Sequence, residues 1–214
     1  MILSRGRRYL FIHIPKTGGT SMALALEARA MKDDEMLGDT PKARRRRGRL
    51  DGAQARGRLW KHATLCDLDG IVSRDEMREL FVFTMVRNPW DRAVSYYHWL
   101  LEQRFDHPAV RDAQAMTFAD FLAHPRTRAA FRSHPARSYV SDPDGVDCCD
   151  LYIRLEHWKD DAAPLRDHVG FPLDLGHANA SDRVRDHRTH YTDATAALVA
   201  EDCAEDIARF GYTF

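Results

Sequence analysis

Residues 9–21 constrain the fold of this 214-residue chain more than any other segment. They read Tyr-Leu-Phe-Ile-His-Ile-Pro-Lys-Thr-Gly-Gly-Thr-Ser, and an alanine- and leucine-rich stretch follows directly. The pattern predicts a buried strand over residues 9–14 and a helix over residues 20–31. Gly18 and Gly19 let the backbone approach a ligand closely, and the first N–H groups of a helix have no partners within it. The segment therefore predicts a strand, a tight loop and a helix N-terminus that bind a phosphate-like anion.

The side chains of this loop also suit an anion. Lys16 supplies a positive charge, and hydroxyl groups come from Thr17, Thr20 and Ser21. The order of residues differs from that of an ATP-binding Walker A loop, in which the lysine follows the glycines at the start of the helix. Lys16 precedes the glycines, so its amine is expected at the strand end of the loop. The alternative interpretation is an ordinary Gly-Gly turn between a strand and a helix.

A second apolar run, residues 80–86, predicts another strand, and its continuous hydrophobicity is typical of a parallel sheet covered on both faces. A helix is predicted to follow over residues 89–103. Arg87 then stands at the carboxyl end of a strand, where open α/β sheets bind ligands. Ser95 lies two turns along the helix, so a guanidinium and a hydroxyl could share a second phosphate. The alternative is a structural arginine paired with a carboxylate such as Asp91.

The rest of the chain continues the alternation of strands and helices. The pattern predicts a basic irregular segment over residues 32–58, a short apolar or helical patch around 59–72, helical stretches near 117–133, 157–169 and 193–209, a turn at 142–145 and a strand near 150–155. This order favours an α/β fold with a central parallel sheet flanked by helices. The length predicts a single domain over residues 1–214.

Composition sets further limits on the kind of protein. No window reaches the roughly eighteen apolar residues of a membrane helix, and the first predicted strand begins too near Met1 to leave room for a signal peptide. We therefore expect a cytoplasmic protein without stable membrane insertion. The four cysteines show no metal-ligand spacing, and we expect no bound metal.

The formal net charge of zero hides an asymmetry. Residues 1–62 carry fifteen Lys or Arg and six Asp or Glu, and much of this excess lies in residues 42–49, Lys-Ala-Arg-Arg-Arg-Arg-Gly-Arg. Such a block is typical of a solvated or disordered loop, and it could also attract an anionic acceptor or nucleotide. Because no nucleic-acid motif accompanies it, no nucleic-acid partner is expected.

The two loop segments, in this order, resemble those of sulfotransferases that use 3′-phosphoadenosine 5′-phosphosulfate (PAPS). Phe-Ile-His-Ile-Pro-Lys-Thr-Gly-Gly-Thr-Ser, residues 11–21, is similar to the family's 5′-phosphosulfate loop, and Val-Arg-Asn-Pro-Trp-Asp-Arg-Ala-Val-Ser-Tyr-Tyr, residues 86–97, to its 3′-phosphate segment. The similarity is greatest to heparan 2-O-sulfotransferase-like enzymes and short bacterial sulfotransferases. It extends to the closing Phe-Gly-Tyr-Thr-Phe, and residues 32–58 and 104–145 match only loosely. The resemblance implies a P-loop-NTPase-like three-layer fold.

The resemblance also implies roles for individual residues. PAPS is the expected donor, bound by residues of the two segments and of the loop before the last helix: Lys16, Thr17, Gly18, Gly19, Thr20, Ser21, Arg87, Ser95, Ser181 and Arg183. Lys16 would neutralise charge on the leaving phosphate. His62, placed where the family has a histidine before its second nucleotide-binding strand, is the candidate base, because a neutral imidazole accepts a proton near neutral pH. His13, Glu102 and Asp91 are the rivals.

Three functions follow as hypotheses. The first is sulfuryl transfer from PAPS to an acceptor hydroxyl. The expected acceptor is a carbohydrate, and an anionic glycan or a lipid would also fit. The second is a P-loop-like nucleotide kinase or NTPase, against which the position of Lys16 argues. The third is a non-catalytic nucleotide-binding relative. The presence of Lys16, Arg87, Ser95 and His62 together favours the first over the third.

Overall fold

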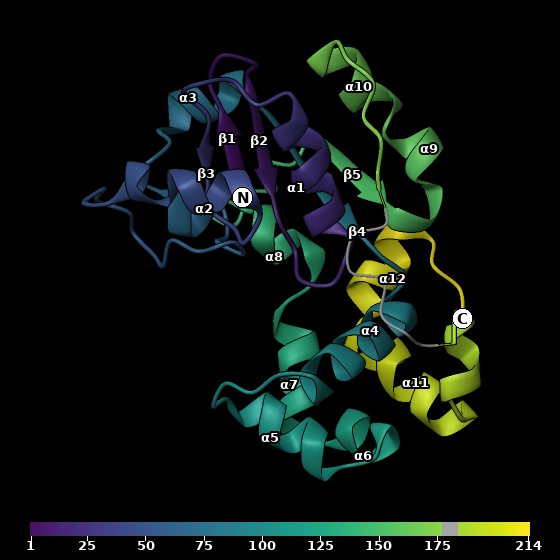
Figure 1. Ribbon diagram of the computed structural model, residues 1–214. Helices are drawn as coiled ribbons and strands as arrows, with labels where there is room; N and C mark the ends of the chain where they lie inside the picture. The colour runs from purple at the N-terminus through teal and green to yellow at the C-terminus, as the bar shows by residue number, and fades with distance from the viewer. Residues whose placement is uncertain (177–183) are drawn as a thin grey trace. The chain divides into compact units, whose positions relative to one another are not determined.

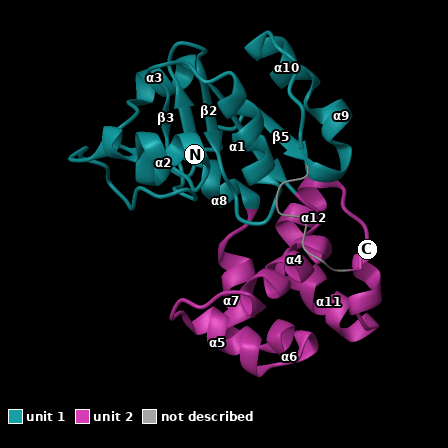
Figure 2. Cartoon of the chain, viewed as in Figure 1, with its two compact units in different colours: residues 1–86, 136–179 teal, residues 87–135, 180–214 magenta. Residues whose placement is uncertain are grey.

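The computed structural model describes residues 1–176 and 184–214, which form two compact units (Figure 1, Figure 2). Unit 1 comprises residues 1–86 and 136–179, and unit 2 comprises residues 87–135 and 180–214. The chain thus leaves unit 1 after its fourth strand, builds the first part of unit 2, returns to unit 1 and ends in unit 2. One domain over residues 1–214 stays a prediction.

Unit 1 is built on a five-stranded sheet with the order β3-β1-β2-β4-β5. Three strands run parallel to one another: β2 (Tyr9–Ile12), β4 (Phe81–Val86) and β5 (Leu151–Arg154). The other two are β1 (Ile2–Ser4), antiparallel to β2, and β3 (Glu35–Met36), antiparallel to β1. The predicted mixed α/β fold with a central, mostly parallel sheet is confirmed. Strands β1 and β3 were not predicted, because two or three residues are too few to show a period.

Both faces of the parallel strands are covered, as their continuous apolar runs predicted. Because successive strand residues point to opposite faces, Phe11 shares one face with Phe83, and their rings stack with centroids 5.2 Å apart. This face packs against helices that supply Met22, Leu26 and Leu165. Helix α8 (Ala136–Val140) also contacts β4.

The other helical segments of unit 1 are short. They are α1 (Gly19–Ala28), α2 (Pro41–Arg46), η1 (Arg47–Leu50), η2 (Cys66–Leu68), α3 (Arg74–Glu79), η3 (Leu155–His157), α9 (Trp158–Asp161) and α10 (Ala163–Val169).

The basic segment is more ordered than its charge predicted. Residues 41–50 form α2 and η1, so the expectation of an irregular segment throughout is wrong here. The reason lies in Glu27 of α1, whose buried carboxylate accepts the backbone N–H of Ala43 at 3.0 Å and the hydroxyl of Thr40. A carboxylate at a helix N-terminus satisfies donors that have no intrahelical partner. This contact stabilises the start of α2.

Unit 2 is helical. Its elements are α4 (Pro89–Leu101), α5 (Pro108–Ala115), α6 (Phe118–Ala123), α7 (Pro125–Ser133), η4 (His187–His190), α11 (Asp193–Asp202) and α12 (Ala204–Phe210). Trp90 is buried among Leu122 and Val199, and its indole N–H donates to the carbonyl of Ala196 at 2.9 Å. This packing ties α4 to α11.

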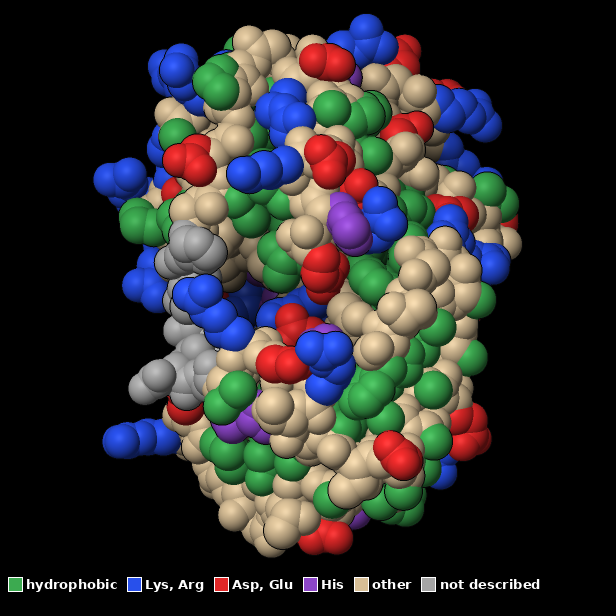
Figure 3. All heavy atoms as spheres, turned by 90° about the vertical axis from the view of Figure 1, so that its right-hand side faces the viewer, with side chains coloured by type: hydrophobic (Ala, Val, Ile, Leu, Met, Phe, Trp, Pro, Cys, Tyr) green, Lys and Arg blue, Asp and Glu red, His purple; other side chains and the backbone are tan. Residues whose placement is uncertain are grey.

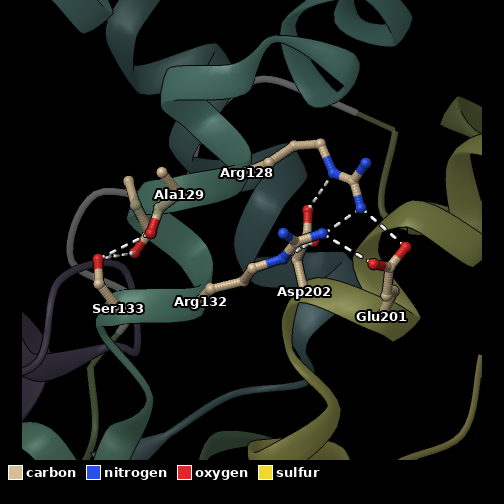
Figure 4. Close-up of polar contacts among 7 residues, drawn as sticks. Arg128, Ala129, Arg132, Ser133, Glu201 and Asp202 are labelled. Carbon is tan, nitrogen blue, oxygen red and sulfur yellow. Dashed lines mark hydrogen bonds and ion pairs between the residues drawn. The ribbon is translucent and has the colours of Figure 1, made fainter.

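A charged cluster also fastens α7 to α11 within unit 2 (Figure 4). The carboxylate of Asp202, whose side chain is only 2% exposed, accepts hydrogen bonds from Arg128 at 2.9 and 3.0 Å and from Arg132 at 2.6 Å. The neighbouring Glu201 binds the same two guanidinium groups from the solvent side, with its side chain 63% exposed.

Charged side chains of both signs are interspersed over the face drawn in Figure 3. Among the described helices, none combines the length and apolar character that crossing a membrane requires.

Candidate active site

The loop between β2 and α1 reverses direction through left-handed backbone. Lys16 has φ of 68° and Gly18 has φ of 86°. A non-glycine residue with positive φ is strained, and such strain is typical of functional loops. Gly18 is the N-cap of α1 and offers no side chain to cap it, and the first intrahelical bond runs from the N–H of Met22 to the carbonyl of Gly18. The N–H groups before Met22 therefore lack partners within the helix.

The two glycines are required by packing inside unit 1. A Cβ added at Gly19 would lie 2.1 Å from Cδ2 of His13, and one added at Gly18 would lie 2.8 Å from Cδ1 of Leu155. Packing thus excludes a side chain at Gly19 whether or not a ligand is bound, and at Gly18 the left-handed φ also disfavours one. The sequence predicted the glycines from ligand approach, and the neighbouring side chains supply a second reason that it could not show.

The hydroxyl groups of the loop differ in their surroundings. Thr17 is buried, and its Oγ1 donates to the carbonyl of Ile14 at 2.9 Å, so its proton stabilises the loop itself. Ser21 is also buried. Thr20 is half-buried and lines a cavity of about 30 Å³ together with His13 and Lys61.

His62 lies directly beside the end of β2. Its Nδ1 is 2.8 Å from the backbone carbonyl of His13, and the two imidazole rings meet edge to face with centroids 4.5 Å apart. A neutral imidazole that bonds to a carbonyl must donate through the nitrogen nearest it, so Nδ1 carries the hydrogen and Nε2 keeps its lone pair. The two residues are 49 positions apart, so no local sequence pattern could show this contact.

Burial lowers the pKa of both histidines. The pKa of His62 falls to about 4, because desolvation outweighs the hydrogen bond to the His13 carbonyl, which acts in the opposite direction. The pKa of His13 falls well below its usual value, chiefly through desolvation and then through His62. The sequence predicted a histidine that titrates near neutrality. The structure instead gives an imidazole that stays neutral throughout the physiological range.

Arg87 and its neighbours form a separate set of residues in unit 2. The guanidinium of Arg87 binds the carboxylate of Asp91 through Nε at 2.8 Å and Nη2 at 2.6 Å, and both side chains are largely buried. Ser95 is buried one turn beyond Asp91 on α4. The pairing of Arg87 with Asp91 is the alternative that the sequence left open, and it fixes the orientation of the guanidinium.

Other predicted site residues have less to support them. Ser181 and Arg183 lie outside the described residues. Glu102 is exposed at the C-terminal end of α4. Asp91 is engaged by Arg87 and is a weaker candidate base for that reason. Within the described residues, no group of three or more His, Cys, Asp or Glu side chains could hold a metal ion.

Comparison with protein-family models decides the family. The model of the sulfotransferase family matches residues 1–207, nearly the whole chain and all the loop residues described above. The chain belongs to the sulfotransferase family. The prediction made from the two loop segments is thereby confirmed.

A search of curated proteins finds no match. Among solved structures, mouse sulfotransferase SULT7A1 complexed with PAP is similar, with a TM-score of 0.48 and 14% sequence identity over 94% of this chain and 84% of that one.

Proposed function

We propose that this sulfotransferase moves a sulfuryl group from PAPS to a hydroxyl group, and that the acceptor is a carbohydrate. The observation that carries the proposal is the β2–α1 loop. It combines the strained Lys16, two glycines whose positions exclude side chains, and the N-terminus of α1. Such a loop binds a phosphate-like group in a fixed position.

In the proposed reaction, the acceptor oxygen forms a bond to sulfur as the bond from sulfur to the bridging oxygen of the 5′-phosphate breaks. The products are the sulfated acceptor and 3′-phosphoadenosine 5′-phosphate (PAP). As in phosphoryl transfer, positioning and charge stabilisation supply most of the catalysis. Lys16 is assigned to the charge that develops on the leaving phosphate, where one positioned donor is typically worth about 3 to 4 kcal/mol. Gly18, Gly19, Thr20 and Ser21 hold the phosphate through the loop and the start of α1, and Thr17 maintains the loop.

His62 is assigned as the base that takes the proton of the acceptor hydroxyl. The carbonyl of His13 fixes the tautomer, so the proton is accepted at Nε2. The low pKa keeps this nitrogen unprotonated at neutral pH. It also makes the imidazole a weak base, which suits a loose transition state in which the acceptor loses its proton late.

Arg87 and Ser95 are assigned to the 3′-phosphate of the nucleotide. The contact with Asp91 holds the guanidinium rigid, and a preorganised fork loses little entropy on binding oxygen atoms. Ser181 and Arg183 are proposed as further nucleotide contacts on their sequence positions alone. A phosphoryl-transferring kinase is disfavoured by the family assignment, whereas a non-catalytic relative is tested directly by transfer.

The test measures transfer and binding in the same variant. With labelled PAPS and an acceptor found by screening glycans, lipids and small metabolites, Lys16→Ala should lower turnover by about 10²-fold or more. The affinity for PAP, measured by calorimetry, should fall by much less, because the interaction strengthens as charge develops. Thr20→Ala is the control and should weaken the binding of PAP with little change in turnover. Equal losses in Lys16→Ala would make Lys16 a ground-state anchor, and no transfer by the wild-type protein to any acceptor would favour the non-catalytic relative.

A further inference from the structure

A cavity of about 520 Å³ lies in unit 1 at the amino ends of the parallel strands. Its wall includes Arg8, Leu80 and Asp150, which directly precede β2, β4 and β5. The β2–α1 loop stands at the other end of β2, so the candidate active site does not account for this cavity. A volume of about 300 to 1,000 Å³ is typical of pockets that bind small molecules. The cavity is therefore large enough for a second ligand.

Arg8 has strained backbone at the edge of this cavity. Its φ is 56°, and among the non-glycine residues of ranges 1–176 and 184–214 only Lys16 of the candidate active site also has a positive φ. The conformation is held by the carbonyl of Arg8, which accepts hydrogen bonds from the N–H of Phe81 at 2.8 Å and from Nε2 of His168 at 3.0 Å. Glycine adopts left-handed backbone at little cost, so an arginine held there points to a use for its side chain.

Charges of both signs line the cavity and do not neutralise one another. The wall carries the guanidinium groups of Arg7 and Arg8 and the carboxylates of Glu79 and Asp150. In the part of the chain that the structure describes, none of these four groups forms an ion pair. By contrast, Arg5 of the same turn binds two carboxylates, at 3.0 and 2.5 Å. The cavity therefore offers both positive and negative groups to one ligand.

Contacts with the backbone hold these charged groups at the wall. Nε of Arg8 donates to the carbonyl of Glu79 at 3.3 Å, and Nη2 of Arg7 donates to the C-cap carbonyl of α1 at 3.1 Å. Oδ2 of Asp150 accepts the N–H of Val82 at 2.7 Å. A guanidinium has about five N–H donors and a carboxylate about four acceptor positions, so each group keeps capacity for a ligand. Groups fixed in advance lose little entropy on binding.

We propose that this cavity binds a small zwitterion, in which a short carbon chain separates an acidic group from an ammonium group. The acidic group binds the two arginines, and the ammonium group binds the two carboxylates. The carbon chain lies against the rings of Phe81 and His168, which line the cavity and stack with centroids 4.6 Å apart. The proposal does not rest on the transfer reaction, because none of these residues belongs to the proposed PAPS site.

Both signs of charge are needed, because a ligand with one sign would meet two like charges. A plain anion would be attracted by the arginines and repelled by the carboxylates, and a plain cation would experience the reverse. An uncharged ligand would desolvate all four groups without giving them partners. A zwitterion pairs with the groups of both signs.

The test uses 6-aminohexanoate, hexanoate and hexylamine, which share an unbranched carbon chain and differ in their charged groups. Binding is followed by NMR through the imidazole C–H signals of His168, which are assigned by their loss in His168→Gln. We expect 6-aminohexanoate to shift these signals and to bind about three- to tenfold more tightly than either singly charged compound. Lys16→Ala should leave all three affinities unchanged, because Lys16 lies beyond the other end of β2.

Variants of the wall assign each charge. Arg8→Gly removes the guanidinium and the strain, so it should weaken the binding of 6-aminohexanoate about three- to tenfold without lowering the urea midpoint. Glu79→Gln should weaken the binding of 6-aminohexanoate and should not weaken that of hexanoate. Arg5→Gln is the matched control, because Arg5 belongs to the same turn and is already paired, and it should leave the affinity for 6-aminohexanoate unchanged.

Any of three results would overturn the site. Equal binding of the three compounds would leave no role for charges of both signs, and an equal loss in Arg5→Gln and Arg8→Gly would reduce the effect to net charge. A lower urea midpoint of Arg8→Gly with unchanged binding would assign Arg8 to the fold alone. None of these measurements involves PAP or transfer, so their failure rejects this site and leaves the proposed function untouched.

Discussion

The β2–α1 loop of unit 1 and the arginine pairs of unit 2 are held in place by different physical means. In the loop, the determinants are backbone shape and desolvation: left-handed φ at Lys16, a glycine packed on His13, and a buried His62 with a depressed pKa. In unit 2, the determinants are charge pairs, Arg87 with Asp91 and the arginines around Asp202. The stability of the loop should therefore fall when side-chain volume is added and change little with salt concentration. The stability that the arginine pairs contribute should depend on salt concentration and change little with added volume.

The largest effect is expected at His62. If His62 is the base, His62→Ala should lower turnover by about 10²- to 10⁴-fold with little change in PAP affinity, because the variant loses the base and keeps the loop. The wild-type kcat/KM should fall only as the pH drops through about 4, since protonation of Nε2 removes the acceptor lone pair and burial has lowered the pKa from its usual value.

A second variant separates chemistry from structure at this position. His62→Asn keeps a donor for the His13 carbonyl and has no basic nitrogen, so it should fold like the wild type and be as slow as His62→Ala. An acidic limb that persists in either variant would move the base elsewhere, first to His13 and then to Glu102.

Gly19→Ala tests the dependence of the loop on shape. The added Cβ would lie 2.1 Å from the ring of His13, so the free energy of unfolding should fall by about 3 kcal/mol, at the upper end of the cost of overpacking. Urea denaturation measures it. Gly38→Ala is the control, because its Cβ would meet only Ala43 at 3.6 Å, an ordinary contact. In the double variant His13→Ala/Gly19→Ala, much of the lost stability should return. A double variant no more stable than Gly19→Ala would show that this clash is not the cause.

Asp202→Asn tests the dependence of unit 2 on charge. The carboxylate is buried between two arginines, and its neutralisation should cost about 2 kcal/mol of stability because the guanidinium groups lose their partner. Glu201→Gln changes the exposed half of the same cluster and should cost less than about 0.5 kcal/mol. Chemical denaturation with urea at low and high salt compares them. Equal costs in the two variants would remove the distinction between buried and exposed carboxylates.

Much of the fold was predictable from local patterns. Strands β2 and β4 and helices α1 and α4 lie within one to three residues of their predicted ends, because an apolar run, a Gly-Gly pair and a proline mark them in the sequence. Helix α5 was missed, and α2 was predicted to be irregular. The order of α2 depends on Glu27, fourteen residues before its first residue, and no local pattern contains that contact.

The candidate site was predictable by residue type and not by environment. The sequence selected Lys16, the glycines and Arg87 because charge, turn chemistry and strand ends are visible in it. It could not show that His62 is desolvated beside His13, since this depends on a contact between distant segments. It also could not show that Trp60 is exposed, because exposure is a property of the packed chain.

The most direct test of the account is the affinity for PAP relative to AMP, measured by calorimetry. If Arg87 and Ser95 bind a 3′-phosphate, the wild-type protein should bind PAP about ten- to a hundredfold more tightly than AMP, because a charge-assisted contact left unmade costs about 1.5 to 3 kcal/mol. Arg87→Ala should abolish the preference and leave the AMP affinity unchanged. Equal affinities of the wild-type protein for PAP and AMP would contradict the assignment of a PAPS-dependent site.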